Sequence, residues 1–261
     1  GQLVSGELDV DRMDYLVRDA HHTGVPYGTI DHGRLVRELR FVGDELVLAE
    51  GNVQTAESLL LARALMNPTV YNHHVARISK ATLRRGAERL VRSGAVDPVT
   101  FAGMDDADLL VAMREHEGAA PFARRLDHRD LPKRAVWAEY GDVDDALVDA
   151  DRDTVAGYEV DIAERAGVDP GEVILDVQPR PEMTESTSRV VVNGEVRRLA
   201  TQSGLVEALR AAQIEQWRLG VYAPEDETER VGEAAESVLG LDLDALVVDV
   251  RKGVNRRLDQ F

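Results

Sequence analysis

The sequence predicts a mainly α protein, in which a helical body is followed by a small α+β module. Three observations support this fold class. Apolar residues recur at helical spacing through much of residues 1–140, strand-like runs become frequent in residues 154–261, and the most acidic stretch, residues 141–153, lies between the two patterns. We therefore expect a helical domain at 1–140, a linker at 141–153 and an α+β module at 154–261.

The first predicted helix covers residues 8–22. Its apolar residues share one face and are Met13, Leu16, Val17 and Ala20. At about 100° per residue, Asp11, Tyr15 and Asp19 line up on the opposite face. One face of this helix is expected in the core, and the other is available for chemistry.

Further helices and one hairpin complete the predicted helical body. Asp31 is a predicted N-cap, and Pro68, directly after Asn67, is well placed to open a helix. The expected hairpin turns at Gly43 and Asp44. The predicted helices cover residues 34–41, 55–66, 68–93, 105–118 and the beginning of 121–140, and the hairpin covers residues 41–50.

The module after the linker mixes strands with helices. The run VILDV at 173–177 predicts a strand, and Asn193-Gly194 between two apolar runs predicts a hairpin with a type I′ turn. We expect a helix at 203–217, a strand at 218–224 and a helix at 225–239.

Composition excludes several classes of protein. Of the 261 residues, 44% are hydrophobic, which is enough for a sizeable core, and the absence of Cys excludes disulfides and thiolate metal sites. No stretch approaches the roughly 18 apolar residues of a membrane span, and the first ten residues lack the layout of a signal peptide. We expect a cytoplasmic protein with no membrane partner.

The charge balance is strongly acidic. The formal net charge is −17, and among 31 basic residues only Lys80, Lys133 and Lys252 are lysines. Such a surface repels itself unless salt screens it, so we expect a halophilic source, although a GC-rich genome alone also favours Arg over Lys. Since no Lys/Arg-rich run carries interleaved aromatic residues, nucleic acid is not an expected partner.

The stripe of Asp11, Tyr15 and Asp19, with Arg12 and Arg18 beside it, suits a metal and a phosphorylated sugar. Carboxylates bind divalent cations, guanidinium groups bind phosphate oxygens, and an aromatic ring packs on a sugar. A solvated helix face with ion pairs explains the same spacing. Spacing alone does not decide between them.

Residues 9–25, DVDRMDYLVRDAHHTGV, closely resemble a motif helix of HD-superfamily phosphohydrolases, in the deoxynucleoside triphosphate (dNTP) triphosphohydrolase branch that includes the SAM-and-HD-domain dNTPase. Residues 63–74, RALMNPTVYNHH, are similar to its later substrate helix, and MDDADLL and RDLPKR resemble further landmarks. The resemblance covers about residues 5–140 and is compatible with archaeal members. It implies an HD-type helical body, a homo-oligomer, and metal-dependent hydrolysis of a deoxynucleotide substrate to deoxynucleoside and triphosphate.

The resemblance also implies roles for residues of the first helix. Asp11 would be the last metal ligand, Tyr15 would pack on the nucleoside, and Asp19 would accept a hydrogen bond from the sugar 3′-hydroxyl. Arg12 stands where the family usually has Lys and would touch the triphosphate, and His21 matches a further pocket position. Arg offers a rigid fork where Lys offers a point charge, so this departure bears on substrate preference.

Three residues of the later helix complete the expected substrate site. Arg63 would be a second phosphate contact, Tyr71 would lie against the sugar and screen its 2′ position, and Asn72 replaces the usual Gln near the 3′-hydroxyl. The metal would be a divalent ion such as Mn, Mg, Fe or Zn.

The remaining metal ligands of the family have no counterpart in the sequence. The family places a His and a His-Asp doublet before the position of Asp11, whereas this chain has no His-Asp dipeptide, and its histidines all follow Asp11. We therefore expect an HD-type body that is incomplete at its N-terminus, and no metal-dependent turnover by this chain alone, because one carboxylate cannot hold a catalytic metal.

Two alternatives remain beside the dNTP triphosphohydrolase. One is a non-catalytic nucleotide-binding or regulatory fragment, and the other is an HD phosphohydrolase that acts on another phosphate ester. His73 and His74 are not expected to bind one metal, because adjacent helical side chains point about 100° apart.

Overall fold

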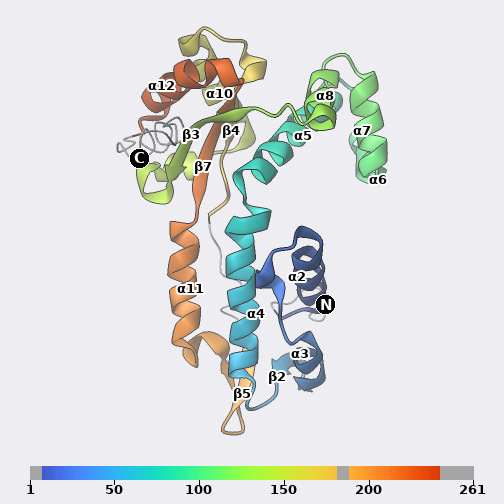
Figure 1. The fold of residues 1–261 in the computed structure, drawn as a ribbon, viewed down its shortest axis with the longest axis vertical. Coiled ribbons are helices and arrows are strands. Elements are labelled where there is room, and N and C mark those ends of the chain that lie inside the picture. Colours follow the sequence, from blue (N-terminus) through green and yellow to red (C-terminus); the bar gives the residue numbers. More distant parts are fainter. Residues whose placement is uncertain (1–7, 181–187, 242–261) are drawn as a thin grey trace, which may run out of the picture. The chain divides into compact units, whose positions relative to one another are not determined.

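The computed structural model describes residues 8–180 and 188–241. The chain divides into two compact units, and each is built from two separate stretches of the sequence (Figure 1). Unit 1 comprises Gly1–His73 and Pro181–Trp217, and unit 2 comprises His74–Arg180 and Arg218–Phe261.

Unit 1 combines three longer helices, namely α2, α4 and α11, with short helices and a four-stranded sheet. The sheet has the order β1-β2-β5-β6, in which two antiparallel hairpins are joined by a parallel pairing of Leu48 with Val190. Its helices are α2 (Val10–Thr23), η1 (Pro26–Gly28), α3 (His32–Glu38), α4 (Val53–Met66), η2 (Asn67–Tyr71), η6 (Leu199–Thr201) and α11 (Gly204–Glu215). Its strands are β1 (Leu39–Val42), β2 (Glu45–Leu48), β5 (Arg189–Val192) and β6 (Glu195–Arg198).

Local sequence signals set the bounds of several elements in unit 1. The Asp9 carboxylate caps α2 by accepting a hydrogen bond from the Arg12 N–H at 2.6 Å. Asp31 caps α3 in the same way, as predicted. Asn193 and Gly194 both have positive φ, which confirms the predicted type I′ turn between β5 and β6.

The core of unit 1 lies between α2, α4, α11 and the sheet. The expected inner face of α2 is confirmed, since Met13 and Leu16 are buried and Val17 and Ala20 pack against the same core. The other main core residues are Leu35, Leu48, Leu59, Leu60, Met66, Val190, Leu199, Val206 and Leu209. This packing fixes which face of α2 is turned outward.

Gly28 lies where η1 crosses α2 and leaves no space for a side chain. A Cβ atom at this position would lie 2.2 Å from the Leu16 carbonyl oxygen and 2.4 Å from the Ala20 Cβ. We expect Gly28→Ala to lower the free energy of unfolding by about 1–3 kcal/mol, because backbone must move to relieve the overlap. Chemical denaturation followed by circular dichroism measures this loss.

Gly33→Ala is the matched control for this substitution. Gly33 lies in α3, and the nearest atom to its added Cβ would be 3.5 Å away. Alanine also has the higher helix propensity. Equal stability of the two variants would contradict the close packing of η1 on α2.

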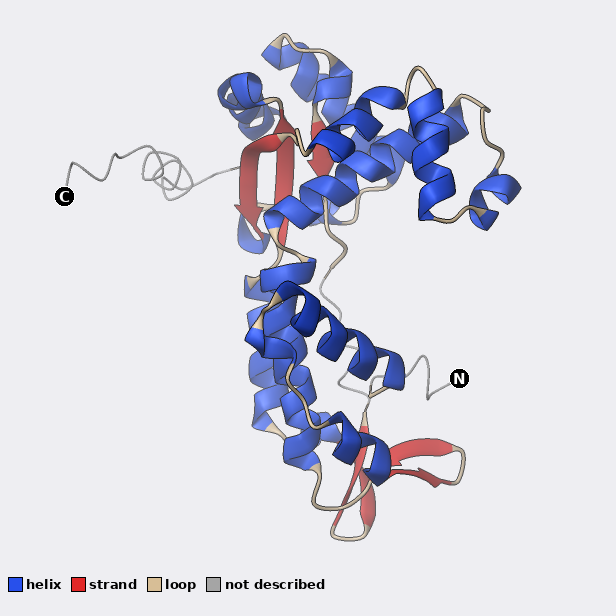
Figure 2. Cartoon of the chain, turned by 45° about the vertical axis from the view of Figure 1, so that its right-hand side comes forward, coloured by secondary structure: helices blue, strands red, loops and turns tan. Residues whose placement is uncertain are grey.

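Unit 2 is built around a three-stranded antiparallel sheet of order β3-β7-β4. The strands of both units can be followed in Figure 2. The strands of unit 2 are β3 (Lys133–Glu139), β4 (Ile174–Asp176) and β7 (Arg218–Ala223). Its helices are α5 (His74–Arg92), α6 (Pro98–Gly103), α7 (Asp106–Glu115), α8 (Ala120–His128), η3 (Tyr140–Asp142), α9 (Asp145–Val148), α10 (Arg152–Ala166), η4 (Pro170–Glu172), η7 (Glu225–Glu227) and α12 (Thr228–Leu239).

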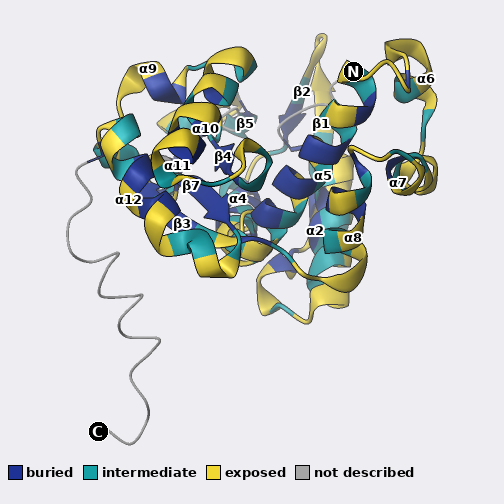
Figure 3. Cartoon of the chain, turned by 90° about the horizontal axis from the view of Figure 1, so that it is seen from above, coloured by how far each residue is buried: buried dark blue, intermediate teal, exposed yellow. Residues whose placement is uncertain are grey.

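Helices cover this sheet, and its central strand is buried. α10 and α12 pack on each other and contact the sheet, α5 contacts β4, and α7 and α8 pack against α5. Figure 3 shows β7 in the colour of buried residues, whereas α12 is buried on one side only. Ile78 of α5 packs with Ile174 and Tyr222 of the sheet. The sheet thus anchors α5 through apolar contacts.

The mainly α fold with a small sheet-containing module is confirmed, and most predicted elements are present. The division by contacts differs from the predicted one. Residues 141–153, the expected linker, include η3 and α9 within unit 2, and the pairing of β2 with β5 joins segments on either side of it. The bounds of a compact unit depend on which distant segments pair with each other. A local run of acidic residues does not reveal that pairing.

The predicted helix opening at Pro68 is wrong in its first turn. Residues Asn67–Tyr71 form a π-helix, and α5 begins only at His74. Within the described residues, none of the helices has the length and apolar character that a bilayer span requires.

Candidate functional site

Two aromatic residues bring the outer face of α2 into contact with η2. The Tyr71 hydroxyl donates a hydrogen bond to Asp19 Oδ2 at 2.9 Å, although the two residues lie far apart in the sequence. The rings of Tyr15 and Tyr71 meet edge to face, with centroids 5.7 Å apart and planes at 84°. Three of the predicted substrate residues therefore form one continuous surface in unit 1.

The π-helix η2 provides the backbone that presents Tyr71. The Asn72 N–H donates to the Asn67 carbonyl at 2.6 Å, which is the i to i+5 bond of a π-turn. Pro68 has no N–H to give to an α-helical ladder, and the Thr69 hydroxyl donates to the Leu65 carbonyl at 2.8 Å. Such single π-turns are frequent at functional sites.

The guanidinium group of Arg63 lies within electrostatic range of Arg12 and of the aromatic pair. Burial lowers the pKa of Arg63, and the positive charge of Arg12 lowers it further, while the neighbouring Tyr15 acts in the opposite direction. Arginine stays charged at neutral pH despite such shifts. Arg12 also pairs with Asp9, whose carboxylate lies 3.3 Å from Arg12 Nε. Arg63 thus shares its electrostatic surroundings with a second guanidinium group and with both rings.

The Tyr71 hydroxyl is held in its protonated form. Burial raises the pKa of Tyr71 above its ordinary value, and the hydrogen bond to Asp19 and the charge of that carboxylate raise it further. The hydroxyl therefore remains a donor at neutral pH and fixes the orientation of Asp19. One oxygen of Asp19 is engaged in this bond, and the carboxylate retains accepting capacity for a ligand hydroxyl.

Five of the predicted residues are thus brought together, and three are not. The five are Arg12, Tyr15, Asp19, Arg63 and Tyr71. Asp11, His21 and Asn72 are exposed, and no contact in the described part of the chain joins their side chains to this group. The His21 ring instead lies against that of His22, with centroids 5.4 Å apart.

A metal site is not complete in the described part of the chain. Among residues 8–180 and 188–241, no group of three or more His, Cys, Asp or Glu residues is arranged to hold a metal ion. Asp11 by itself does not fit a divalent cation, whose affinity depends on several ligands acting together.

Asp9 is the residue of this site that the sequence analysis missed. Its side chain is buried, with 4% relative exposure, and it links the start of α2 to Arg12 and, through its charge, to Arg63. The available signal is its position directly before the helix, where Asp is a common N-cap. A capping role and a role in holding Arg12 are compatible in one carboxylate.

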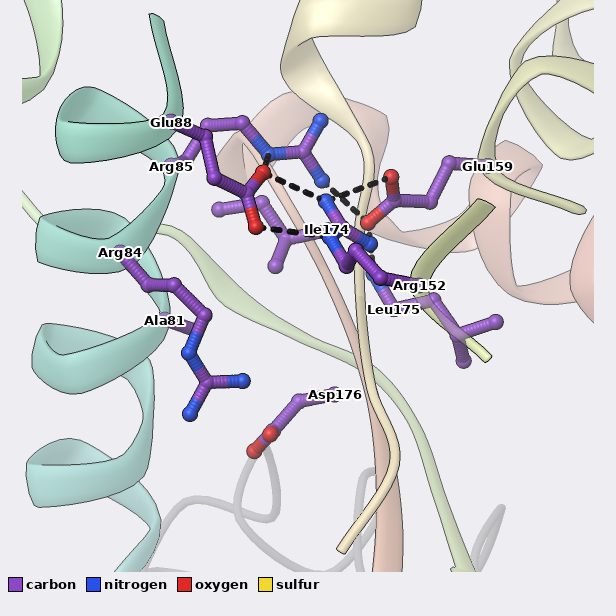
Figure 4. Close-up of a pocket in the computed structure, with 9 residues that line it drawn as sticks. All are labelled: Ala81, Arg84, Arg85, Glu88, Arg152, Glu159, Ile174, Leu175 and Asp176. Atoms are coloured by element: carbon purple, nitrogen blue, oxygen red, sulfur yellow. Dashed lines mark hydrogen bonds and ion pairs between the residues drawn. The ribbon is translucent and has the colours of Figure 1, made fainter. Parts of the chain in front are cut away.

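A second charged group, in unit 2, also escaped prediction. Arg85, Glu88, Arg152 and Glu159 form linked ion pairs between α5 and α10. Burial lowers the pKa of Arg85, and burial acts to raise that of Glu88, but Arg152 and Arg85 outweigh this and leave the pKa of Glu88 below its ordinary value. These residues line a recess in unit 2 (Figure 4).

Comparisons with known proteins identify a family and two relatives of this chain. A family model described as the HD associated region matches residues 30–249. The chain is 30% identical over 241 residues to the uncharacterised protein MJ1154 of Methanocaldococcus jannaschii, covering 89% of this chain and 52% of that protein. It is 27% identical over 260 residues to the uncharacterised protein YwfO of Bacillus subtilis, covering 86% and 57%. The chain thus spans about half the length of these relatives.

Two solved structures share the fold. A hypothetical protein from Aquifex aeolicus has a TM-score of 0.63 at 21% identity, covering 89% of this chain and 58% of that one. A phosphohydrolase from Bacteroides thetaiotaomicron has a TM-score of 0.61 at 21% identity, covering 86% and 63%. At this identity the likeness concerns the fold.

Proposed function

Because this chain belongs to the HD-associated-region family, we propose that it is part of an HD-type phosphohydrolase and that unit 1 carries its substrate-binding face. The observation that carries the proposal is the convergence of Arg63, Arg12 and the Tyr15–Tyr71 pair on one surface. The phosphohydrolase of Bacteroides thetaiotaomicron, which shares the fold, supports the same reaction class.

The chemistry of the surface fits a nucleoside polyphosphate. Arg63 and Arg12 bind phosphate oxygens through charge-assisted hydrogen bonds, and the partial burial of Arg63 strengthens its contact. The rings of Tyr15 and Tyr71 pack on the sugar and base, and Asp19, oriented by Tyr71, accepts a hydrogen bond from a sugar hydroxyl. The substrate that we propose is a dNTP, with Tyr71 excluding a 2′-hydroxyl.

For the whole protein, we propose hydrolysis of dNTP to deoxynucleoside and triphosphate by a homo-oligomer with a divalent metal. Since the described residues hold no complete metal ligand set, the function that we propose for them by themselves is binding of the nucleotide. The same observation favours a second candidate, a nucleotide-binding module without catalysis. Release of triphosphate from dNTP with Mn²⁺, measured on a longer chain that supplies the family's His and His-Asp ligands, separates the two, because this chain alone is expected to release none in either case.

Replacement of Arg63 tests the binding face directly. We expect Arg63→Gln to weaken the binding of dGTP by about tenfold or more, because one lost charge-assisted contact is worth about 1.5–3 kcal/mol. Isothermal titration calorimetry without added metal, at constant ionic strength, measures the change. Salt must be fixed because it screens the phosphate contacts.

Arg18→Gln is the matched control. It makes the same change from Arg to Gln, but on α2. Arg18 is exposed and pairs with Asp14 at 2.7 Å, and no contact in the described residues joins its side chain to the aromatic pair. Equal affinities of the Arg63 and Arg18 variants for dGTP would refute the proposed face, and so would a parent chain that binds no nucleotide.

A further inference from the structure

The recess in unit 2 lies between α5, α10 and β4 and shares no residue with the proposed nucleotide face. Its empty volume is about 240 Å³, which includes space open to solvent. Figure 4 shows charged side chains from the two helices pointing across it, above a wall formed by β4. The charged lining residues are Arg84, Arg85, Glu88, Arg152, Glu159 and Asp176.

Most of these charges already have partners of opposite sign. Arg152 donates to both oxygens of Glu88, at 2.7 and 2.9 Å, and Arg85 pairs with Glu159. Asp176 Oδ2 accepts a hydrogen bond from Arg77 Nε at 2.9 Å. Each carboxylate of the recess is therefore matched by a guanidinium group.

Arg84 is the exception. Its side chain is exposed on α5, and within the described residues it makes neither a hydrogen bond nor an ion pair. In Figure 4 its guanidinium group lies below Glu88 and above Asp176, and no dashed line joins it to another side chain. Arg77, which does not line the recess, neutralises Asp176, so among the lining guanidinium groups only Arg84 has no carboxylate partner in the described residues.

We propose that this recess binds a protonated phosphate-type oxyanion, with Arg84 as its principal ligand. The planar fork of a guanidinium matches two oxygens of such a group. The carboxylates of Glu88 and Asp176 line the same space and have lone pairs to accept a hydrogen bond. Hydrogen phosphate carries a proton to donate to them, whereas sulfate carries none at neutral pH and would meet only repulsion there.

The ligand has two sources with the same chemistry, namely free phosphate and the terminal phosphoryl group of a nucleotide. Neither depends on the nucleotide face of unit 1, because the two sites share no residue. The Arg63→Gln variant therefore allows binding at the recess to be measured by itself, since this substitution weakens the face of unit 1 and leaves the recess intact.

Titration of the full chain with inorganic phosphate, by calorimetry at constant ionic strength and neutral pH, tests the proposal. We expect saturable binding, a loss of affinity of about tenfold or more in Arg84→Gln, and binding of sulfate that is weaker by a similar factor. Arg89→Gln is the matched control, because Arg89 lies on the same helix outside the recess and has no ion pair in the described part of the chain. Its affinity for phosphate should equal that of the parent.

The titration has results that would overturn the site and results that would assign its ligand. Absence of saturable phosphate binding, equal affinities of the Arg84 and Arg89 variants, or equal affinities for phosphate and sulfate would each overturn the site. In the Arg63→Gln background, displacement of phosphate by dGTP assigns the recess to a nucleotide phosphoryl group, and lack of displacement assigns it to free phosphate. Loss of phosphate binding in Arg63→Gln itself would place the anion in unit 1 and overturn the proposal.

Discussion

Glu159→Ala is expected to lower the free energy of unfolding by about 3–5 kcal/mol, the usual cost of removing one partner from a buried ion pair. Glu159 is only 2% exposed and lies on α10. Its carboxylate accepts a hydrogen bond from the Leu175 N–H at 2.9 Å and pairs with Arg85. Alanine would leave the buried Arg85 guanidinium and the Leu175 amide without this acceptor.

Urea denaturation monitored by tryptophan fluorescence measures the loss. Glu164→Ala is the matched control, because Glu164 lies on the same helix, is exposed, and makes no ion pair in the described structure. Its effect should stay within about 0.5 kcal/mol. A similar small effect for Glu159→Ala would contradict a buried ionic link between α10, α5 and β4.

Replacement of Arg77 by itself should lower the free energy of unfolding strongly, and simultaneous replacement of Asp176 should recover part of that loss. Both side chains are buried, at 3% and 4% exposure. Arg77 donates to Asp176 Oδ2 at 2.9 Å, and its guanidinium carbon lies 4.6 Å from the Trp137 ring centroid. The Tyr222 hydroxyl also donates to Asp176 Oδ2 at 2.9 Å. We expect Arg77→Met to cost about 3–5 kcal/mol, since a buried carboxylate is left without its counter-charge.

The double variant Arg77→Met/Asp176→Leu should cost less than Arg77→Met alone, because apolar side chains of similar volume replace a buried ion pair at little cost. A double-mutant cycle in urea gives the coupling energy of the pair. Additive losses would show that the two side chains contribute independently, and would contradict a pair whose main cost is the uncompensated charge.

The sequence was sufficient for features that neighbouring residues determine. The cap at Asp31, the inner face of α2 and the turn at Asn193-Gly194 depend on positions within one or two turns of the chain. Side-chain direction and φ preference are local properties, so a single sequence reveals them.

The candidate site could not be assembled from periodicity. Tyr71 and Asp19 meet across a long separation, and only the family resemblance suggested that they share a function. The π-turn at Asn67–Tyr71 was missed, because Pro after a helical run is equally compatible with the start of a new α-helix. Glu159 was also missed, because no helix was expected over residues 152–166 and because the burial of a glutamate there depends on Arg85 from another helix.

The pairing of Leu48 with Val190 has a consequence for synthesis of the chain. At about 5–20 residues per second, the roughly 140 residues between them take on the order of ten seconds to leave the ribosome. During that interval, the inner faces of α2 and α4 lack Val190, Val206 and Leu209 as partners. Unit 1 therefore closes only after residues 74–180 have been made, and a nascent chain halted before β5 exposes apolar surface that chaperones bind.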